Sequence, residues 1–378
     1  MNMPTEGLTR GSEGVGPQNP DSMTKGVGAA KVVTMATVAR VAGCSQGAIS
    51  SLLNDRDYGI RVGLKTRERI FKTCRDLGYI PNDLRAFVRI YPEQGETCLL
   101  VSDKVCRGLE NPFVARLAAA VMAHAPQQPA SIGLVVYNET REYKAGTELP
   151  SPIKNGTASR ILCVGTENES IGRVIHERGL PGIVLGHSAQ TPGTASILPD
   201  YTSAARLALS LLVGQGHRQV GIVSGPFGDP EPRHAEMSHA IASVAHEMGL
   251  TIEAGNVFHG SLTFEAGVAA GTSMRAHASA PTALLCMTET AAIGVLASAH
   301  LHGIRVPEEL SVIAFVDHAG MLDACIPLTA VILPVDEIAT AAVKEADRQL
   351  LEGIPATARK ILIPVRLIER ATCGPAKG

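Results

Sequence analysis

Four small or polar residues lie along one side of a predicted helix between residues 46 and 53. Gln46, Gly47, Ser50 and Ser51 recur at the spacing of a single helix face. The major groove of DNA admits a helix whose outer face is slim and polar, and a glutamine amide can pair with the edge of an adenine. Serine hydroxyls reach phosphates or either type of base. The pattern therefore indicates that this helix reads duplex DNA.

Three further polar residues border this helix. Ser45 stands where it would cap the helix, and Thr34 stands at the same place before a preceding helix. We expect Thr34 and Asn54 to donate to phosphates and so to fix the register of the helix on the duplex. Ser45 belongs to the same predicted DNA-binding set.

Three short helices, over residues 35–42, 46–53 and 64–77, are predicted to position these side chains, because their apolar residues recur every three or four positions. Gly43 ends the first, since glycine tolerates positive φ. Two short helices around a glycine-containing turn are typical of a helix-turn-helix. A helical DNA-binding domain is therefore expected over residues 32–80; the alternative is a three-helix bundle that only packs.

Charge is unevenly distributed along the chain. Residues 31–91 hold eleven Lys and Arg against five Asp and Glu, whereas residues 92–378 hold 21 against 28. A basic head on an acidic body indicates a polyanionic partner for the head alone, although a solvated charged face would give the same count. Residues 81–95 form a short bridge between the two parts, in which Arg85 and Arg89 are expected to contact phosphates.

Several protein classes are excluded or disfavoured by composition. The eight cysteines are scattered without CxxC spacing, so reduced thiols are expected and no metal site or cofactor is predicted. No long uncharged apolar run and no secretory signal are present, so we expect a cytoplasmic protein with no membrane partner. Residues 1–31 are rich in Gly, Pro and Ser and are predicted to be a disordered tail.

From residue 96 onward, strand-like and helix-like segments alternate, which predicts parallel sheets with helices on both faces. The number of strands favours two α/β lobes with a ligand cleft between them. The expected core spans residues 96–370 and is followed by a tail at 371–378. Within it, we assign residues 96–195 and 317–333 to lobe 1, and residues 196–316 and 334–370 to lobe 2.

The head resembles that of the lactose-repressor (LacI/GalR) family of transcriptional regulators. Residues that match the family pattern in order are Thr34, Val38, Ala39, Ala42, Gly43, Ser45, Ile49, Ser50, Leu53 and Asn54, then TRERI at 66–70, LGY at 77–79, and PN at 81–82. The resemblance implies a helix-turn-helix head on a periplasmic-binding-protein-like core with Rossmann-like lobes. Ser51 stands where the family often has Arg or His, which leaves the preferred operator base open.

The bridge resembles the hinge helix of this family, which in relatives folds on the operator and wedges a leucine into the minor groove. By position the wedge here is Val88, and Phe87 is a rival. Valine is shorter than leucine, so a weaker kink is expected. The alternative interpretation of the bridge is a plain linker.

The body resembles the family core, and the resemblance implies an effector site in the cleft. The residues carried over are Asp103, Asn111 or Phe113, Arg233, Thr288 or Glu289, and Asp317. Arg233 offers a planar guanidinium for a carboxylate, phosphate or vicinal hydroxyls, or it is a surface arginine in a proline-rich loop. The implied effector is a sugar or another metabolite.

These observations predict a transcriptional regulator of the repressor type, which binds a near-palindromic double-stranded operator as a homodimer. A small molecule between the lobes is expected to modulate its operator affinity. One alternative is a DNA-binding regulator whose core no longer senses a ligand. A more remote one is an enzyme on the same scaffold, which the missing G-x-S-x-G and phosphate-binding motifs disfavour.

Overall fold

The structure is a computed structural model. It describes residues 33–54, 62–105, 112–124, 132–144, 148–165, 168–189, 191, 194–225, 232–250, 252–260, 262–274, 280–316, 327–357 and 359–377. The expected N-terminal tail, residues 1–31, lies outside them. Among these residues no helix is both long and apolar enough to cross a membrane.

The head consists of helices whose ends are set by local chemistry. The Thr34 side chain accepts from the backbone N–H of Thr37, which begins α1, and Gly43 at φ 63° ends it. Gly78, at φ 66°, ends α3 in the same way. The bounds are α1 Met35–Ala42, α2 Gln46–Asn54, α3 Leu64–Leu77 and α4 Leu84–Ile90, followed by the 3-10 turn η1 Pro92–Gln94. The three predicted helices of the head are confirmed.

The first lobe is built on a parallel sheet. Its described strands follow the order β11-β5-β4-β3-β1-β2, and every pairing is parallel. The strands are β1 Glu96–Ser102, β2 Ile132–Tyr137, β3 Ala158–Val164, β4 Gly182–Leu185, β5 Ala195–Pro199 and β11 Lys360–Ile363. Its helices are α5 Pro112–His124, α6 Ser151–Asn155, α7 Glu169–Glu177 and α12 Val335–Glu352.

The second lobe repeats this plan with one reversed strand. The described order is β12-β10-β9-β8-β6-β7, in which β12 alone runs antiparallel to its neighbour. The strands are β6 Val220–Ser224, β7 Val257–His259, β8 Ala283–Cys286, β9 Ser311–Val316, β10 Thr329–Ile332 and β12 Arg366–Ile368. Its helices are α8 Tyr201–Gly214, α9 Pro232–Glu247, α10 Phe264–Ser273 and α11 Glu289–Leu301, with the short turn η3 Ala254–Asn256. The two-lobed α/β prediction is confirmed.

The C-terminal segments lie in the lobes opposite to those that the sequence led us to expect. We expected residues 317–333 in lobe 1, but β10 belongs to the second sheet. We expected residues 334–370 in lobe 2, but α12 and β11 belong to lobe 1, and of that segment's strands β12 is the one that lies in the second sheet. The cause is that the chain crosses between the lobes after β5, after β10 and again after β11.

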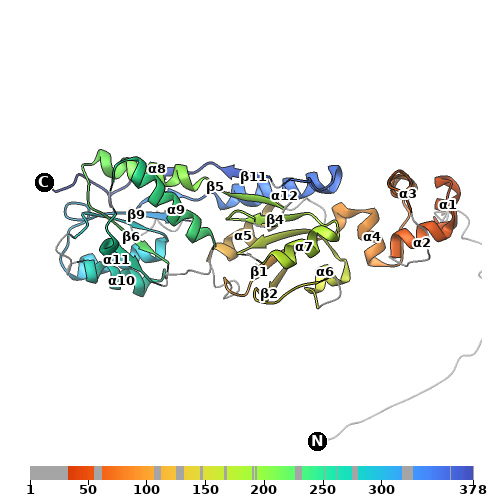
Figure 1. Cartoon of the computed structure of the whole chain (residues 1–378), viewed down its shortest axis with the longest axis horizontal. Helices are drawn as coiled ribbons and strands as arrows, with labels where there is room; N and C mark the ends of the chain where they lie inside the picture. The colour runs from red at the N-terminus through yellow and green to blue at the C-terminus, as the bar shows by residue number, and fades with distance from the viewer. Residues whose placement is uncertain are drawn as a thin grey trace, which may run out of the picture.

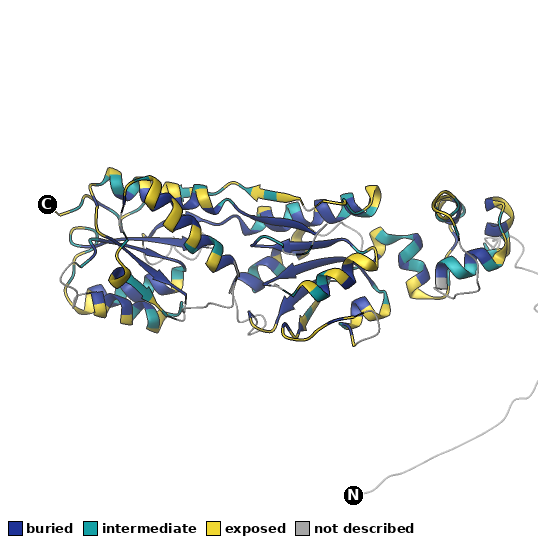
Figure 2. Ribbon diagram, in the orientation of Figure 1, coloured by how far each residue is buried: buried dark blue, intermediate teal, exposed yellow. Residues whose placement is uncertain are grey.

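Alternate residues of each central strand pack on opposite faces of its sheet. Leu99 and Val101 of β1 contact the α5 and α12 side, whereas Leu100 faces the cluster that contains α7. In the second lobe, Leu285 of β8 packs with α8 and α9, and Leu284 packs with α10 and α11. Fully burying one such leucine contributes about 1.5–3 kcal/mol. Figure 2 shows both sheets as buried layers between helices with exposed outer faces.

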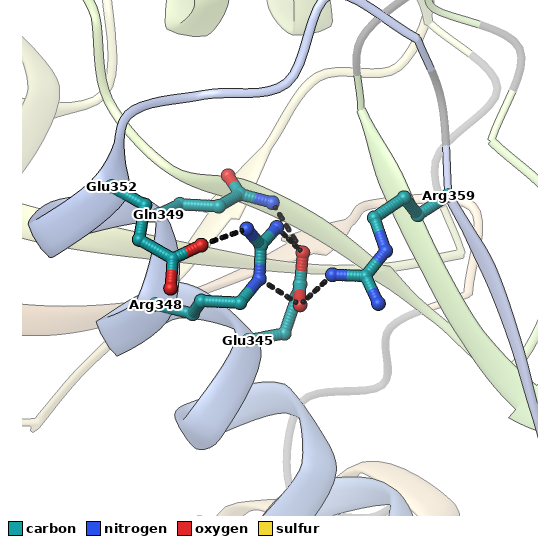
Figure 3. A network of polar contacts seen from close by, with 5 residues as sticks. All are labelled: Glu345, Arg348, Gln349, Glu352 and Arg359. Atoms are coloured by element: carbon teal, nitrogen blue, oxygen red, sulfur yellow. Dashed lines mark hydrogen bonds and ion pairs between the residues drawn. The ribbon is translucent and has the colours of Figure 1, made fainter.

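A buried carboxylate holds the end of α12 against the approach to β11. Glu345 is 5% exposed and accepts from Arg348 of its own helix and from Arg359, at 2.6 and 3.0 Å. Gln349 also donates to it, and Arg348 bridges onward to Glu352 (Figure 3). These hydrogen bonds keep the pKa of Glu345 below its usual range, Arg348 being the main cause. The network fixes α12 and β11 together in lobe 1.

The last residues of the chain lie along the second lobe. The Thr372 hydroxyl donates to the Val312 carbonyl, and the backbone N–H of Gly374 donates to the Ser311 hydroxyl. Figure 1 shows the two lobes in a row with the head beyond the first, and the C-terminus at the opposite end of the molecule.

Candidate nucleic-acid interface and interlobe crevice

Helix α2 presents the expected polar residues on the side that does not pack into the head. Gln46 is exposed, and Gly47, Ser50 and Ser51 are half-buried. On the opposite side, three apolar residues are buried with relative exposures of 8% or less, namely Ala48, Ile49 and Leu53. The sequence prediction that residues 46–51 form an outward polar face therefore agrees with the fold.

The bordering residues take more specific roles. The Ser45 side chain accepts from the backbone N–H of Ala48 at 3.1 Å, so its oxygen caps α2 while its hydroxyl hydrogen can still donate. Thr34 is exposed, and its hydroxyl lies 3.1 Å from that of Thr37. Asn54 is the last residue of α2, and its side chain lies outside the described part.

The head surface is basic beyond α2. Exposed cationic residues of α1 and α3 are Arg40, Lys65, Arg67, Arg69, Lys72 and Arg75. Such a surface attracts the phosphate backbone without regard to sequence. Burial raises the pKa of the Cys74 thiol to about 11, so this cysteine remains a neutral part of the core of the head.

The bridge is a helix that packs into the head. Ala86 and Ile90 of α4 belong to the apolar core of the head and are 1% and 0% exposed. Val88, the expected wedge, is also buried, at 7% exposed, and its side chain lies against Gly95. Phe87 is half-buried and contacts the ring of Tyr91 at 5.1 Å. In this arrangement Val88 faces the protein, so a wedge role requires α4 to turn.

The two arginines of α4 differ in their surroundings. Arg85 is exposed, and its aliphatic stem lies beside Gly156 of the first lobe. Arg89 is half-buried, and its guanidinium donates to the carbonyls of Leu52 and Leu53, at 2.9 and 3.2 Å. The sequence alone gave the two residues the same expected role at phosphates.

The lobes meet over a closed crevice at the carboxyl ends of β3 and β4, which in this structure has no room for a water molecule. Arg233, from the first turn of α9 in lobe 2, lies 4.1 Å above the ring of Phe113 in lobe 1. Arg233 is 8% exposed and Phe113 is 2% exposed. The crevice is lined by Phe113, Val164, Gly165, Leu185, His187 and Arg233. A guanidinium on an aromatic face is an attractive pairing, so the two lobes touch at this point.

Sequence reasoning found Phe113 and Arg233 but missed Gly165 and His187. Gly165 follows β3 at φ 67°, and His187 lies two residues after β4 and is 2% exposed. The available signal was position, because ligands of open α/β sheets bind beyond the carboxyl ends of strands. The resemblance implied candidate residues after β1, β8 and β9, but none after β3 and β4.

The other expected effector residues are not part of the described crevice lining. The exposed carboxylate of Asp103 accepts from the backbone N–H of Glu139 at 3.0 Å. Thr288 caps α11 by accepting from Ala291, and half-buried Glu289 follows it in the first turn. Asn111 and Asp317 lie outside the described residues. The structure thus brings two of the seven together.

The described residues contain no cluster of three or more His, Cys, Asp and Glu side chains that could hold a metal ion. His217, which is 1% exposed, instead contacts the hydroxyls of Thr282 and Ser311 and the carbonyl of Gly374 at 2.8 to 3.0 Å. Burial lowers the pKa of His217. These contacts fit a structural histidine that joins the C-terminal segment to the lobe.

Comparison with known proteins agrees with this geometry. Residues 209–373 match the family model of the periplasmic binding protein-like domain. The HTH-type transcriptional repressor CytR of Escherichia coli is 27% identical over 81% of this chain and 86% of its own length. Catabolite control protein A of Priestia megaterium is 26% identical, over 82% of this chain and 91% of its own.

Solved structures share the fold. The lac repressor dimer bound to operator and an anti-inducer matches with a TM-score of 0.60 and 22% identity, covering 90% of this chain and 99% of that one. The relatives matched by sequence are transcriptional regulators and not enzymes. In its basic head and its two-lobed core, this chain is similar to HTH-type transcriptional regulators that match along most of its length, and it shares the fold of the lac repressor.

Proposed function

We propose that this regulator represses transcription by binding a near-palindromic operator as a homodimer, and that a metabolite held between its lobes sets its operator affinity. The observation that carries the proposal is the outer face of α2, where exposed Gln46 begins a row of small and hydroxyl-bearing residues. A helix of this profile fits the major groove with its N-terminal residues toward the bases. DNA binding also places the working protein in the cytoplasm.

Base recognition is assigned mainly to Gln46. Its amide can donate to and accept from an adenine, and such a bidentate contact is worth about 1–3 kcal/mol of discrimination. Gly47 allows close approach, and Ser50 and Ser51 supply hydroxyls along the same face. Phosphate contacts from Thr34 and Arg85, both exposed, add affinity without sequence preference.

The homodimer is supported by apolar surface on the body. Helix α11 is apolar on nearly all sides, and its last residue, Leu301, is 75% exposed. In the first lobe, Met122 of α5 and Val136 of β2 are 65% and 48% exposed. Both β2 and α10, the packing partner of α11, appear along the lower side of the body in Figure 1. Exposed apolar side chains that gather on one face of a protein are typical of an interface.

The effector site is assigned to the crevice where Arg233 meets Phe113. A ligand there would touch both lobes, so its affinity would depend on how far the lobes close. Regulation requires such a difference in affinity between two conformations. A sugar is one candidate class, because structural neighbours include a CelR–cellobiose complex and a regulator from Enterococcus faecium with bound ribose. The crevice also offers a guanidinium to a carboxylate or phosphate.

The test is selection of operator sequences from random duplex DNA, with and without a metabolite extract. We expect an inverted repeat to be enriched and the extract to change its retention. The Gln46→Ala variant should lose about tenfold or more in affinity at one base position. Gln219→Ala, an exposed glutamine of lobe 2, is the matched control and should bind as the wild type does.

Two results would contradict parts of the proposal. If the purified protein shows no salt-sensitive affinity for any duplex, the DNA-binding role fails. If an operator is enriched but no metabolite alters its binding, the chain is a regulator whose core does not sense a small molecule.

A further inference from the structure

Arg89 stands on the hinge helix α4, but its side chain reaches the recognition helix α2. One nitrogen, Nη1, donates to the carbonyl oxygens of Leu52 at 2.9 Å and Leu53 at 3.2 Å. Helix α2 ends at Asn54, so both acceptors belong to its last turn. The last four carbonyls of a helix have no partner within the helix and carry the negative end of its dipole.

The sequence of α2 does not supply this charge itself. Its last turn contains no basic residue. A cation near the final carbonyls is favourable, and here it comes from a residue some 36 positions later in the chain. Arg89 therefore acts at the C-terminal end of α2, while Gln46, at the opposite end of the same helix, faces outward.

Helix α4 is itself held in place from the other side. Arg75 of α3 donates through its Nη1 to the carbonyl of Ile90 at 3.1 Å, at the C-terminal end of α4. The Tyr91 hydroxyl donates to the Tyr79 carbonyl at 3.2 Å. Ile90 is fully buried in the core of the head. An arginine of α3 thus caps α4, and an arginine of α4 caps α2.

From these contacts we infer that Arg89 is a positioning residue for sequence reading, which couples the orientation of α2 to that of the hinge helix. This inference rests on the proposed function, since it concerns how the DNA-reading helix is held. It differs from the role expected from the sequence, in which Arg89 contacts phosphate. A positioning residue affects discrimination between sequences, whereas a phosphate contact affects all duplexes alike.

The test compares the variants Arg89→Met and Arg85→Met, two changes of the same charge and size on one helix. Affinity is measured for a selected operator duplex and for a scrambled duplex over a range of salt concentrations. For Arg89→Met we expect about a tenfold loss on the operator, little change on the scrambled duplex and an unchanged salt slope. For Arg85→Met we expect equal losses on both duplexes and a salt slope lower by about 0.9 per phosphate contact removed. Arg89→Lys, which keeps a cation at the end of α2, should restore most of the discrimination.

A second measurement needs no DNA. Backbone hydrogen–deuterium exchange of full-length Arg89→Met should become faster in α2 and stay unchanged in α1 and α3. Loss of protection throughout the head would overturn the inference, because Arg89 would then support the whole core. Equal losses on both duplexes with a reduced slope would overturn it in favour of the phosphate role. Failure of the wild type to bind any duplex would instead refute the proposed function, and the exchange measurement would still decide the role of Arg89.

Discussion

Arg160 is a buried charge at the junction between the body and the bridge, and it pairs with Asp347. We predict that removing Arg160 and removing Asp347 lower the stability of the protein by unequal amounts. Arg160 lies in β3 and is 1% exposed. Its Nε donates to the carboxylate of Asp347 on α12 at 2.6 Å, and Nη1 donates to the Ser159 hydroxyl at 3.2 Å. Nη2 lies 3.5 Å from the carbonyl of Glu93 in η1, directly after α4.

The two sides of this ion pair differ in solvent access. The Asp347 side chain is 38% exposed, whereas that of Arg160 is 2% exposed. Removing one partner of a fully buried pair costs about 3–5 kcal/mol, because the other charge stays buried. Water reaches the Asp347 side of the pair and reduces the cost of leaving Arg160 unpaired. We therefore expect Asp347→Asn to lower the free energy of unfolding by about 2 kcal/mol. Arg160→Met removes the buried charge itself and should cost about 1 kcal/mol or less.

The assay is urea unfolding followed by far-ultraviolet circular dichroism, since the chain contains no tryptophan. The double variant should be no less stable than Arg160→Met alone, which is the non-additivity expected of contacting groups. Asp336→Asn is the matched control, because Asp336 lies on the same helix and pairs with Arg116 at a more exposed site. Its loss should stay within about 1 kcal/mol. If Arg160→Met proves more destabilising than Asp347→Asn, burial of the guanidinium is not what governs this site.

Two further predictions concern the second lobe. A Cβ on Gly267 would lie 2.0 Å from the Ala291 carbonyl oxygen, so Gly267→Ala must separate α10 from α11. We expect it to lower the free energy of unfolding by about 2–4 kcal/mol. The control is Gly214→Ala, where a Cβ would meet no atom within 4 Å beyond its chain neighbours and the backbone of its own helix, and it should change the melting temperature little or raise it. Burial lowers the pKa of His217 below its ordinary 6.5, so the unfolded chain binds more protons between the two pKa values. The free energy of unfolding should therefore fall as pH drops below about 6.5. In unfolding curves measured from about pH 5 to 8, His217→Gln should remove the part of this pH dependence that His217 causes. If the pH dependence of the variant equals that of the wild type, other groups cause it.

The helices of the head could be predicted because their ends depend on local chemistry. Thr34 caps α1 through a residue three positions away, and Gly43 and Gly78 take the positive φ that ends α1 and α3. None of these features needs information from distant parts of the chain. Their bounds therefore followed from residue type and spacing.

Sheet membership near the C-terminus could not be predicted in the same way. Strands β10 and β11 are both four-residue segments rich in aliphatic residues, yet they lie in different lobes. Nothing in either segment specifies its neighbour, because the choice depends on where the chain crosses between lobes. Alternation of strands and helices predicted two sheets but not how these last strands are shared between them.

The orientation of side chains in the site was the least predictable feature. Val88 was placed by resemblance, but which face of α4 is buried depends on how the helix packs between the head and Gly95. Arg89 was expected to contact phosphate because the sequence shows its positive charge. The sequence does not show that the carbonyls at the end of α2 lie within hydrogen-bonding distance. His187 was missed because its only signal was its position after β4, and a single histidine there forms no motif.

The polar contacts of the bridge are individually weak, and this matters for regulation. Each lobe is held by an apolar core, whereas α4 and η1 are also held at single polar contacts, which include Arg89 with α2 and Arg160 with the Glu93 carbonyl. A hydrogen bond of this kind contributes about 0.5–1.5 kcal/mol, or about 1.5–3 kcal/mol when one partner is charged. Coupling between ligand sites is typically about 1–3 kcal/mol. If a metabolite binds between the lobes as proposed, it would supply enough free energy to exchange one or two contacts at the bridge, but not enough to disrupt a lobe. Regulation by lobe closure thus requires that the head be attached to the body by contacts of this kind.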